Sequence, residues 1–237
     1  MTTTYEHIPV MRDRVIELLA PALEADDALL VDGTLGLGGH TEAFLEAFPS
    51  LRVLGIDRDR EAIDQASARL ERFGNRFVSF HGRYDQLGEA VDSLGDGRDV
   101  QGVLLDLGVS SLHLDKAERG FSYVQDAPLD MRMNSEDETT AHEILATYSL
   151  DQLADLFRNL GDEKLAGRYA RAIVSHRETQ PFGTTGELVE VLQEATPYAL
   201  KDRGHPAKRV FQALRMEVNN ELGSLEAVLP VALQRIA

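Results

Sequence analysis

A glycine-rich loop and a separate acid are the residues of this sequence best suited to chemistry. The loop is Asp32-Gly-Thr-Leu-Gly-Leu-Gly-Gly-His40, which has four glycines among residues 33–39 and follows an apolar run. A second apolar run ends in Asp57, 19 residues after Gly38. Glycines let a backbone approach a ligand closely, and an acid ending the second strand can accept hydrogen bonds from two ribose hydroxyls. The spacing therefore predicts a site for an adenosine-containing cofactor.

The glycine spacing distinguishes two classes of cofactor. Nicotinamide dinucleotides are bound by the pattern G-x-G-x-x-G, whereas the glycines here stand at 33, 36, 38 and 39. S-adenosyl-L-methionine has no diphosphate, and its sulfonium and amino groups are positive. Asp32, at the end of the first apolar run, suits those charges. We therefore expect S-adenosyl-L-methionine and keep an NAD-dependent oxidoreductase as the alternative.

Further polar residues follow the third and fourth apolar runs. Asp106 ends the fourth run, and ligands of open α/β sheets bind outside the carboxyl ends of the strands. We expect Asp106 in the same crevice as the loop and Asp57, with a capping role as the alternative. Tyr84 and His113 follow the third and fourth runs, and as single residues both also allow a purely structural interpretation.

Periodicity predicts an α/β fold with a doubly wound parallel sheet in the order 3-2-1-4. Strands are expected at 29–32, 52–57, 77–81 and 100–106, with helices near 41–48, 60–73 and 86–94 and another helix through Met11, Val15, Leu18 and Leu19. Residues 107–137 lack periodicity, and 139–199 is expected to be helical, with capping boxes at Ser149 and Thr184. Helical periodicity then runs from Val210 to the last residue, with Pro230 as a kink or a helix start.

This pattern predicts two domains. Residues 1–106 and 206–237 are expected to form the sheet domain, and 107–205 a loop with a helical insertion that recognises the substrate.

Composition narrows the class of protein. The 237 residues include 24 Lys and Arg against 40 Asp and Glu, a net charge of −16, and no cysteine. Disulfides and thiolate metal sites are therefore excluded. The sequence has no apolar run near the roughly 20 residues that span a bilayer and no signal-peptide pattern, so we expect a cytoplasmic protein without a membrane partner. The acidity fits either an enzyme for a small molecule or a chain adapted to a high-salt cytoplasm.

One stretch of the acidic chain is basic. A solvated helix face is the simpler interpretation, and a polyanionic substrate is the sharper one. Residues 198–215 contain one acid, Asp202, and the aromatic residues Tyr198 and Phe211. They also contain five cations: Lys201, Arg203, Lys208, Arg209 and Arg215.

Together these segments resemble one family over nearly the whole chain, the bacterial small-subunit ribosomal RNA cytosine-N4 methyltransferases of the RsmH or MraW type. The segments that carry the resemblance are Asp32–His40, Gly55–Asp59, Leu105–Ser111, Glu118–Ser122, Pro128–Met133, His205–Arg209 and Gln212–Glu221. The resemblance implies a Rossmann-like S-adenosylmethionine-dependent methyltransferase. Its substrate would be a decoding-region cytosine of 16S rRNA, cytosine 1402, and its partner the small ribosomal subunit.

The resemblance also implies residue roles. Cofactor contacts are expected at Gly38, Gly39, His40, Asp57, Tyr84, Asp106 and His113, the last standing where family members often carry Gln. RNA contacts are expected at Lys208, Arg209 and Arg215. Asp106 is the expected acceptor for the amine protons, because Asp106-Leu-Gly-Val occupies the place of the (Asp/Asn/Ser)-Pro-Pro-(Tyr/Phe) motif of DNA amino methyltransferases.

Family members continue into further strands with a Ser-Phe-His-Ser-Leu-Glu-Asp motif that this sequence does not contain. We therefore expect the late strands to be missing and the fourth strand to be an exposed edge, or one covered by a second copy in a homodimer. The corresponding alternative function is a truncated methyltransferase that binds the cofactor but is inactive.

Overall fold

The computed structural model describes residues 9–200 and 204–237. The chain divides into two compact units. The first comprises the residues up to Ser110 together with Gly223–Ala237, and the second comprises Ser111–Leu222.

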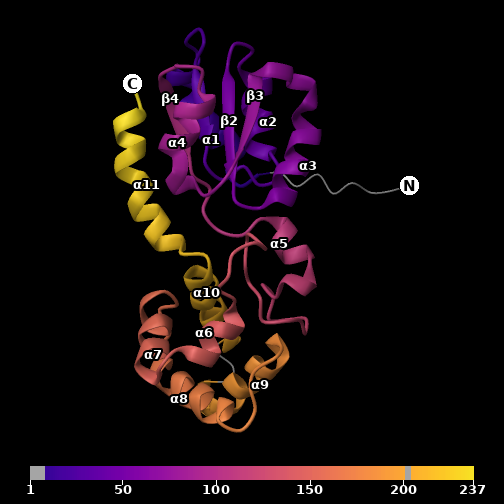
Figure 1. Cartoon of the computed structure of the whole chain (residues 1–237), viewed down its shortest axis with the longest axis vertical. Helices are drawn as coiled ribbons and strands as arrows, with labels where there is room; N and C mark the ends of the chain where they lie inside the picture. Colours follow the sequence, from indigo (N-terminus) through magenta and orange to yellow (C-terminus); the bar gives the residue numbers. More distant parts are fainter. Residues whose placement is uncertain (1–8, 201–203) are drawn as a thin grey trace, which may run out of the picture. The chain divides into compact units, whose positions relative to one another are not determined.

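The first unit is built on a four-stranded parallel sheet (Figure 1). Its order is β3-β2-β1-β4, with β1 at Leu29–Asp32, β2 at Arg52–Asp57, β3 at Phe77–His81 and β4 at Val100–Leu104. The predicted order and the bounds of the first three strands are confirmed. β4 ends two residues earlier than predicted, because β1 turns away at Gly33, whose N–H donates to the Leu104 carbonyl at 2.9 Å.

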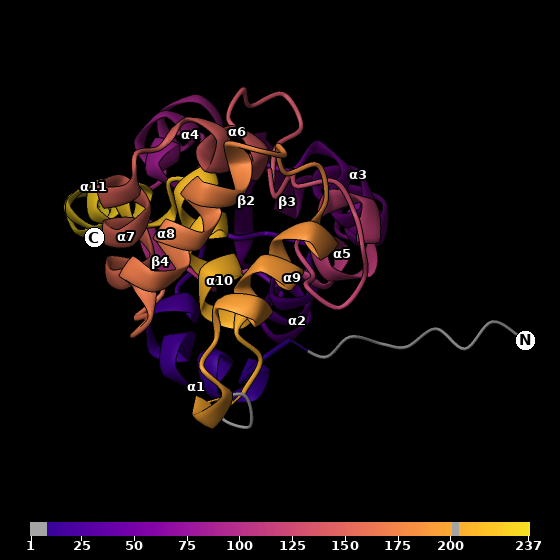
Figure 2. The same ribbon diagram turned by 90° about the horizontal axis from the view of Figure 1, so that it is seen from below.

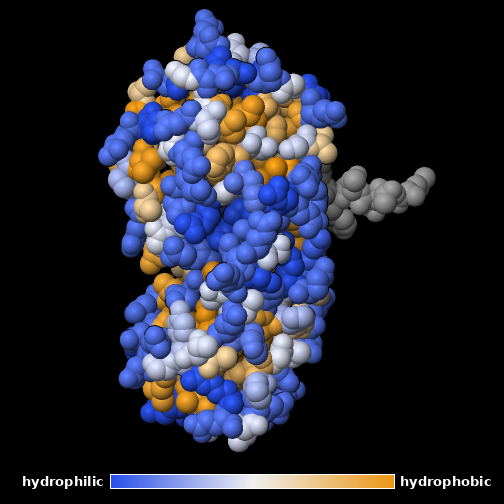
Figure 3. Space-filling model, viewed as in Figure 1, coloured by the Kyte–Doolittle hydropathy of each residue, from blue (hydrophilic) through white to orange (hydrophobic). Residues whose placement is uncertain are grey.

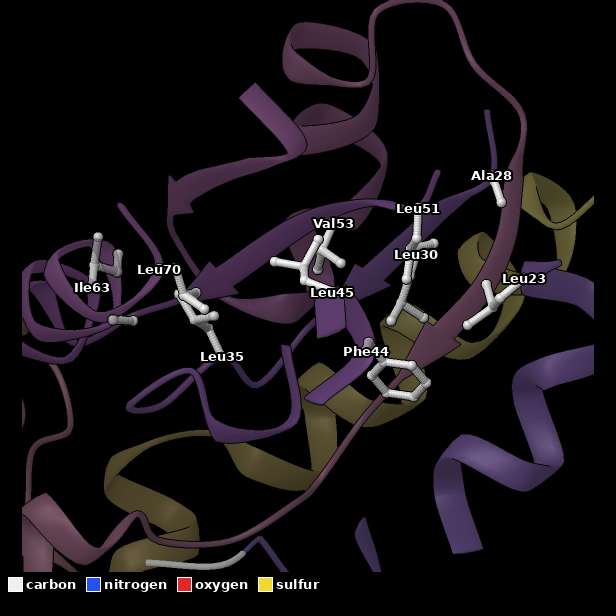
Figure 4. Packing of buried hydrophobic residues seen from close by; sticks show 11 residues of the cluster. Leu23, Ala28, Leu30, Leu35, Phe44, Leu45, Leu51, Val53, Ile63 and Leu70 are labelled. Atoms are coloured by element: carbon white, nitrogen blue, oxygen red, sulfur yellow. The ribbon is translucent and has the colours of Figure 1, made fainter. Parts of the chain in front are cut away.

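Helices cover both faces of this sheet. One core cluster joins Leu30 of β1 and Val53 of β2 to α1 (Arg12–Leu23), α2 (Gly39–Ala47) and α3 (Arg60–Leu70), as Figure 4 shows in part. The opposite cluster joins the alternate strand residues, among them Val31 and Leu54, to α4 (Leu87–Leu94) and α11 (Glu221–Arg235). Burial on both faces is the reason that the strands appear as continuous apolar runs in the sequence.

The apolar face of α1 was predicted only in part. Val15 and Leu19 pack against the core with Ile16, but Met11 and Leu18 are exposed, at 66% and 61%. Met11 precedes the helix in a left-handed conformation, with φ 53°. The buried stripe of α1 therefore continues toward Leu23 and leaves Met11 and Leu18 outside it.

The long C-terminal helix predicted from Val210 is in fact two helices. α10 (Ala207–Val218) ends at Asn219, and Asn220 has φ 46°. Pro230 lies inside α11 and does not mark the break. At the break, the side-chain amide of Asn219 binds backbone groups of another segment, as described below.

β4 is an edge strand, as predicted, but its outer edge is paired at one point. Val100 forms a parallel bridge with Ile236, and the N–H of Ala237 donates to the Val100 carbonyl at 3.0 Å. The last residues of the chain therefore lie beside β4.

The second unit is helical. It contains α5 (Ser111–Asp115), α6 (Ala141–Thr147), α7 (Leu150–Asn159), α8 (Ala166–Arg177), α9 (Thr185–Ala195) and α10. The capping boxes at Ser149 and Thr184 are confirmed, and a third begins at Thr140. The unit reaches Leu222 rather than residue 205, because α10 packs against α6, α7 and α9 (Figure 2).

Hydrophilic residues predominate on the face drawn in Figure 3, with apolar residues scattered among them. None of the helices in the described part of the chain is long and apolar enough to cross a membrane.

Candidate functional site

The glycine-rich loop leaves β1 and forms the start of α2. Gly36 and Gly38 adopt left-handed conformations, with φ 51° and 76°. A Cβ on Gly38 would lie 3.0 Å from a methyl carbon of Leu70 in α3. Gly38 is therefore required both by the turn and by the close packing of the loop against α3.

Asp57 lies at the carboxyl end of β2 and contacts this loop. Its Oδ2 accepts the N–H of Gly36 at 2.7 Å, and its Oδ1 accepts the N–H of Asp59 at 2.8 Å. A carboxylate offers about four lone-pair sites, so these two bonds do not by themselves prevent contact with ribose hydroxyls. The predicted proximity of the loop and the acid is present in the structure.

Asp32, at the end of β1, is a buried carboxylate that holds both ends of the loop. Its Oδ2 accepts the hydroxyl hydrogen of Thr41 at 2.7 Å, and its Oδ1 accepts the N–H of Thr34 at 3.2 Å. Burial raises the pKa of Asp32 to about 6, against the lowering effects of these two bonds and of His40. The nearby charge of Asp57 also raises the pKa.

Asp106 and His40 face each other. Oδ2 of Asp106 lies 3.4 Å from Nε2 of His40, and the Asp106 side chain is half exposed while that of His40 is nine-tenths buried. Nδ1 of His40 is buried without a hydrogen-bond partner in the described structure. The backbone N–H of Asp106 donates to Oγ1 of Thr34 at 2.7 Å.

Tyr84 belongs to the same region, whereas His113 lies in the second unit. Tyr84 begins the short 3-10 turn after β3. It lies close to the glycine-rich loop, because a Cβ placed on Gly33 would be 3.2 Å from the Tyr84 Cβ. His113 is buried in α5 and stacks on Phe121 with ring centroids 4.9 Å apart. The first unit thus brings together the loop, Asp57, Tyr84, Asp106 and His40.

The arrangement has a clear electrostatic character. Asp32, Asp57 and Asp106 place three carboxyl groups at or just beyond the carboxyl ends of β1, β2 and β4. Such a site repels a diphosphate and attracts a ligand with positive groups. The left-handed glycine turn and the buried, unpartnered nitrogen of His40 fit a ligand whose polar groups enter this loop. These features fit S-adenosylmethionine better than a nicotinamide dinucleotide.

The three expected RNA contacts differ in their surroundings. The Lys208 side chain is exposed and has no hydrogen-bond or ion-pair partner among the described residues, while its backbone N–H donates to the His205 carbonyl at 3.2 Å. Arg209 is exposed and donates to the Asp162 carbonyl. Arg215 forms a two-pronged ion pair with Glu221, at 2.7 and 2.9 Å. Lys201 and Arg203, which contributed to the predicted basic stretch, lie outside the described residues.

Several residues of the family-like segments serve the fold of the second unit. The Asn219 amide accepts the N–H of Met133 and donates to the Met131 carbonyl, both at 2.8 Å. Arg119 donates to the Met133 carbonyl at 2.7 Å. A buried Met131 with φ 62° is held in place by these bonds. These residues of the family-like segments therefore have a structural role.

Thr34 and Thr41 were not singled out in the sequence, although both organise the loop. The available signals were an Asp-x-Thr turn and a threonine in the first turn of the following helix, both of which are common patterns. The link from Thr34 to Asp106 spans 72 residues and leaves no local signal in the sequence.

A doubly wound parallel sheet with a glycine turn after β1 and carboxylates after β1, β2 and β4 defines a Rossmann-like protein of the methyltransferase class. The chain belongs to the MraW methylase family, whose family model matches residues 4–237.

Curated relatives agree with this assignment. A protein of Clavibacter sepedonicus named "Ribosomal RNA small subunit methyltransferase H" is 55% identical over 231 residues, which cover 98% of this chain and 72% of that protein. The protein of the same name from Mycobacteroides abscessus is 55% identical and is covered over 62% of its length. A solved rRNA methylase from Streptococcus thermophilus aligns with 48% of this chain and 66% of its own, at 23% identity and a TM-score of 0.34.

Proposed function

We propose that the protein transfers a methyl group from S-adenosyl-L-methionine to N4 of a decoding-region cytosine in 16S rRNA, cytosine 1402. Membership of the MraW methylase family supports methyl transfer, and the names of the relatives support small-subunit ribosomal RNA as the substrate. The observation that carries the choice of cofactor is the group of three carboxyl groups around the glycine turn, because it opposes a diphosphate.

In this proposal, Gly38 and Gly39 give the cofactor close access to the backbone, and Asp57 accepts hydrogen bonds from its ribose. His40, Tyr84 and Asp106 complete the contacts in the first unit. His113 is proposed as a further cofactor contact. When bound, S-adenosylmethionine supplies an electrophilic methyl group on its sulfonium.

The residues of the chain must also prepare the amine. The exocyclic nitrogen of cytosine is a poor nucleophile, because its lone pair is delocalised into the ring. A half-exposed carboxylate can accept hydrogen bonds from the amine protons and orient the lone pair toward the methyl group. Asp106 is the residue proposed for this role, and the target base must leave its stack to reach it.

Lys208 and Arg209 are proposed to contact RNA phosphates, since both are exposed on α10. Arg209 would exchange its ion pair with Asp162, a 93% exposed side chain, for the phosphate. Arg215 would first have to release Glu221, so we assign it to the junction between α10 and α11 instead. The small ribosomal subunit is the proposed partner and the cytoplasm the proposed location.

The test is methyl transfer with labelled S-adenosylmethionine and small ribosomal subunits from cells that lack the gene. The expected result is label on N4 of a single decoding-region cytosine, located by mapping the modified base. Label on an adenine or on protein would refute the proposed substrate. Cofactor binding without transfer would support the inactive-methyltransferase alternative, and binding of NAD in place of S-adenosylmethionine would support an oxidoreductase.

A further inference from the structure

Five residues of the first unit form a closed ring of contacts around the glycine-rich loop. The ring joins β1, α2 and the segment after β4. Thr41 and Thr34 both donate to Asp32, Asp106 donates to Thr34, the Asp106 carboxylate faces His40, and His40 precedes Thr41 in the chain. A displacement of any member must therefore be absorbed by its neighbours in the ring.

Thr34 is the member that connects the loop to Asp106. Backbone pairing between β1 and β4 ends with Asp32 opposite Leu104. The N–H of the next residue, Gly33, donates to the Leu104 carbonyl at 2.9 Å. Beyond this bond, a side-chain hydroxyl and not a β1 carbonyl accepts the N–H of Asp106, at 2.7 Å. The hydroxyl of Thr34 thus extends the pairing past the end of the strand.

The position of Thr34 is itself fixed by a hydrogen bond to the buried Asp32. Its backbone N–H donates to Asp32, which is 1% exposed and also receives the hydroxyl hydrogen of Thr41. Breaking either bond would leave a buried carboxylate oxygen without a donor, which is energetically unfavourable, so both bonds restrict the movement of Thr34 and Thr41. A β-branched side chain also has few χ1 rotamers, which keeps the Thr34 hydroxyl in one direction.

We propose that Thr34 is a positioning residue, which fixes the Asp106 carboxylate opposite His40 and couples its position to the conformation of the glycine-rich loop. The inference rests on the proposed function, in which Asp106 contacts both the cofactor and the amine. A ligand that rearranges the loop would then move Asp106 through the Thr34 hydroxyl.

The test compares Thr34→Val, which removes the acceptor at nearly constant shape, with Thr34→Ser, which keeps it. Both variants retain the backbone N–H that Asp32 binds. In the ligand-free protein, NMR should show amide-proton exchange at Asp106 about tenfold faster in the valine variant and within about twofold of wild type in the serine variant. The Kd for S-adenosylmethionine, measured by calorimetry, should be about tenfold higher than wild type in Thr34→Val and close to the wild-type value in Thr34→Ser.

A control is Thr147→Val in α6, which removes a hydroxyl that also bonds to the backbone, in this case by donating to the Glu143 carbonyl at 2.7 Å. It should change neither Asp106 exchange nor the Kd. Thr34→Ala provides a second removal of the hydroxyl with less bulk, and the same results are expected if the valine variant folds poorly.

Wild-type exchange at Asp106 and an unchanged Kd in folded Thr34→Val or Thr34→Ala protein would overturn the inference. Failure of the wild-type protein to bind S-adenosylmethionine would instead count against the proposed function. The exchange experiment needs no ligand, so the two failures are distinguishable.

Discussion

Asp32 combines burial with two hydrogen-bond donors, and this combination makes it sensitive to pH. Burial raises its pKa from 3.8 to about 6. Between these values the folded protein binds the Asp32 proton more tightly than the unfolded chain does. The proton therefore stabilises the fold fully below about pH 4, and this stabilisation is lost as the pH rises through about 6.

Asp32→Asn, which stays neutral, should not show this loss. The free energy of unfolding of wild type minus that of the variant, from urea titrations, should fall by about 2 kcal/mol between pH 4 and pH 7, because one pKa unit corresponds to about 1.4 kcal/mol and the unfolded carboxyl is already more than half ionised at pH 4. Subtraction removes the contributions of the other carboxylates of this acidic chain. A difference that does not change with pH would show that Asp32 titrates normally.

Asp57 is the residue whose removal tests the ribose contact. Asp57→Ala should weaken S-adenosylmethionine binding by about 1.5–3 kcal/mol, because hydrogen bonds to a charged acceptor are lost. Calorimetry gives the Kd directly. Asp64→Ala is the matched control, since Asp64 is an exposed carboxylate on α3 and its removal changes the net charge equally. Equal effects of the two variants would mean that Asp57 acts on binding only through its charge and not through a ribose contact.

At the scale of elements, the turn from β1 into α2 depends on Gly38. A Cβ there would meet Leu70 at 3.0 Å and Ala66 at 3.3 Å, in a backbone with φ 76°. Gly97 has a similar φ of 71°, but a Cβ on it would meet nothing within 4 Å. The pair therefore separates backbone strain from packing.

Gly97→Ala should destabilise the protein by about 1–2 kcal/mol, the cost of a left-handed conformation for an L-residue. Gly38→Ala should cost about 1–3 kcal/mol more, because the methyl group also overpacks the contact with α3. Chemical unfolding of the two variants and wild type measures both quantities. An equal loss of stability in both would mean that α3 moves to accommodate the methyl group at little cost.

The elements also show what the sequence could predict. The first three strands were predicted to the residue, because parallel strands buried on both faces appear as apolar runs bounded by turn residues. The break at Asn219 was missed, since the contacts that accompany it, from the Asn219 side chain to Met131 and Met133, involve residues almost ninety positions earlier in the chain. The ring through Thr34 was missed for the same reason. Local patterns predict elements, and contacts between distant segments decide where they end.

At the scale of the whole molecule, a net charge of −16 opposes a polyanionic partner. Binding of RNA must then depend on local cations that are not already paired. Many of the described arginines form ion pairs with acids, as Arg215 does with Glu221. Lys208, exposed at the start of α10 and without such a partner, is the cation on which an RNA contact should depend most.

Lys208→Ala should therefore weaken binding of a decoding-region RNA fragment and leave the Kd for S-adenosylmethionine unchanged. Because one phosphate contact is lost, the slope of log K against log salt concentration should decrease in magnitude by about 0.7, the value for a single strand. Arg14→Ala is the control, since Arg14 is an exposed cation on α1 in the first unit that pairs with Glu17 at 2.7 Å. Filter binding over a range of salt concentrations measures the slope for each protein. An unchanged slope for Lys208→Ala would remove α10 from the proposed RNA surface, and an equal decrease for Arg14→Ala would show that the RNA senses only the net charge of the molecule.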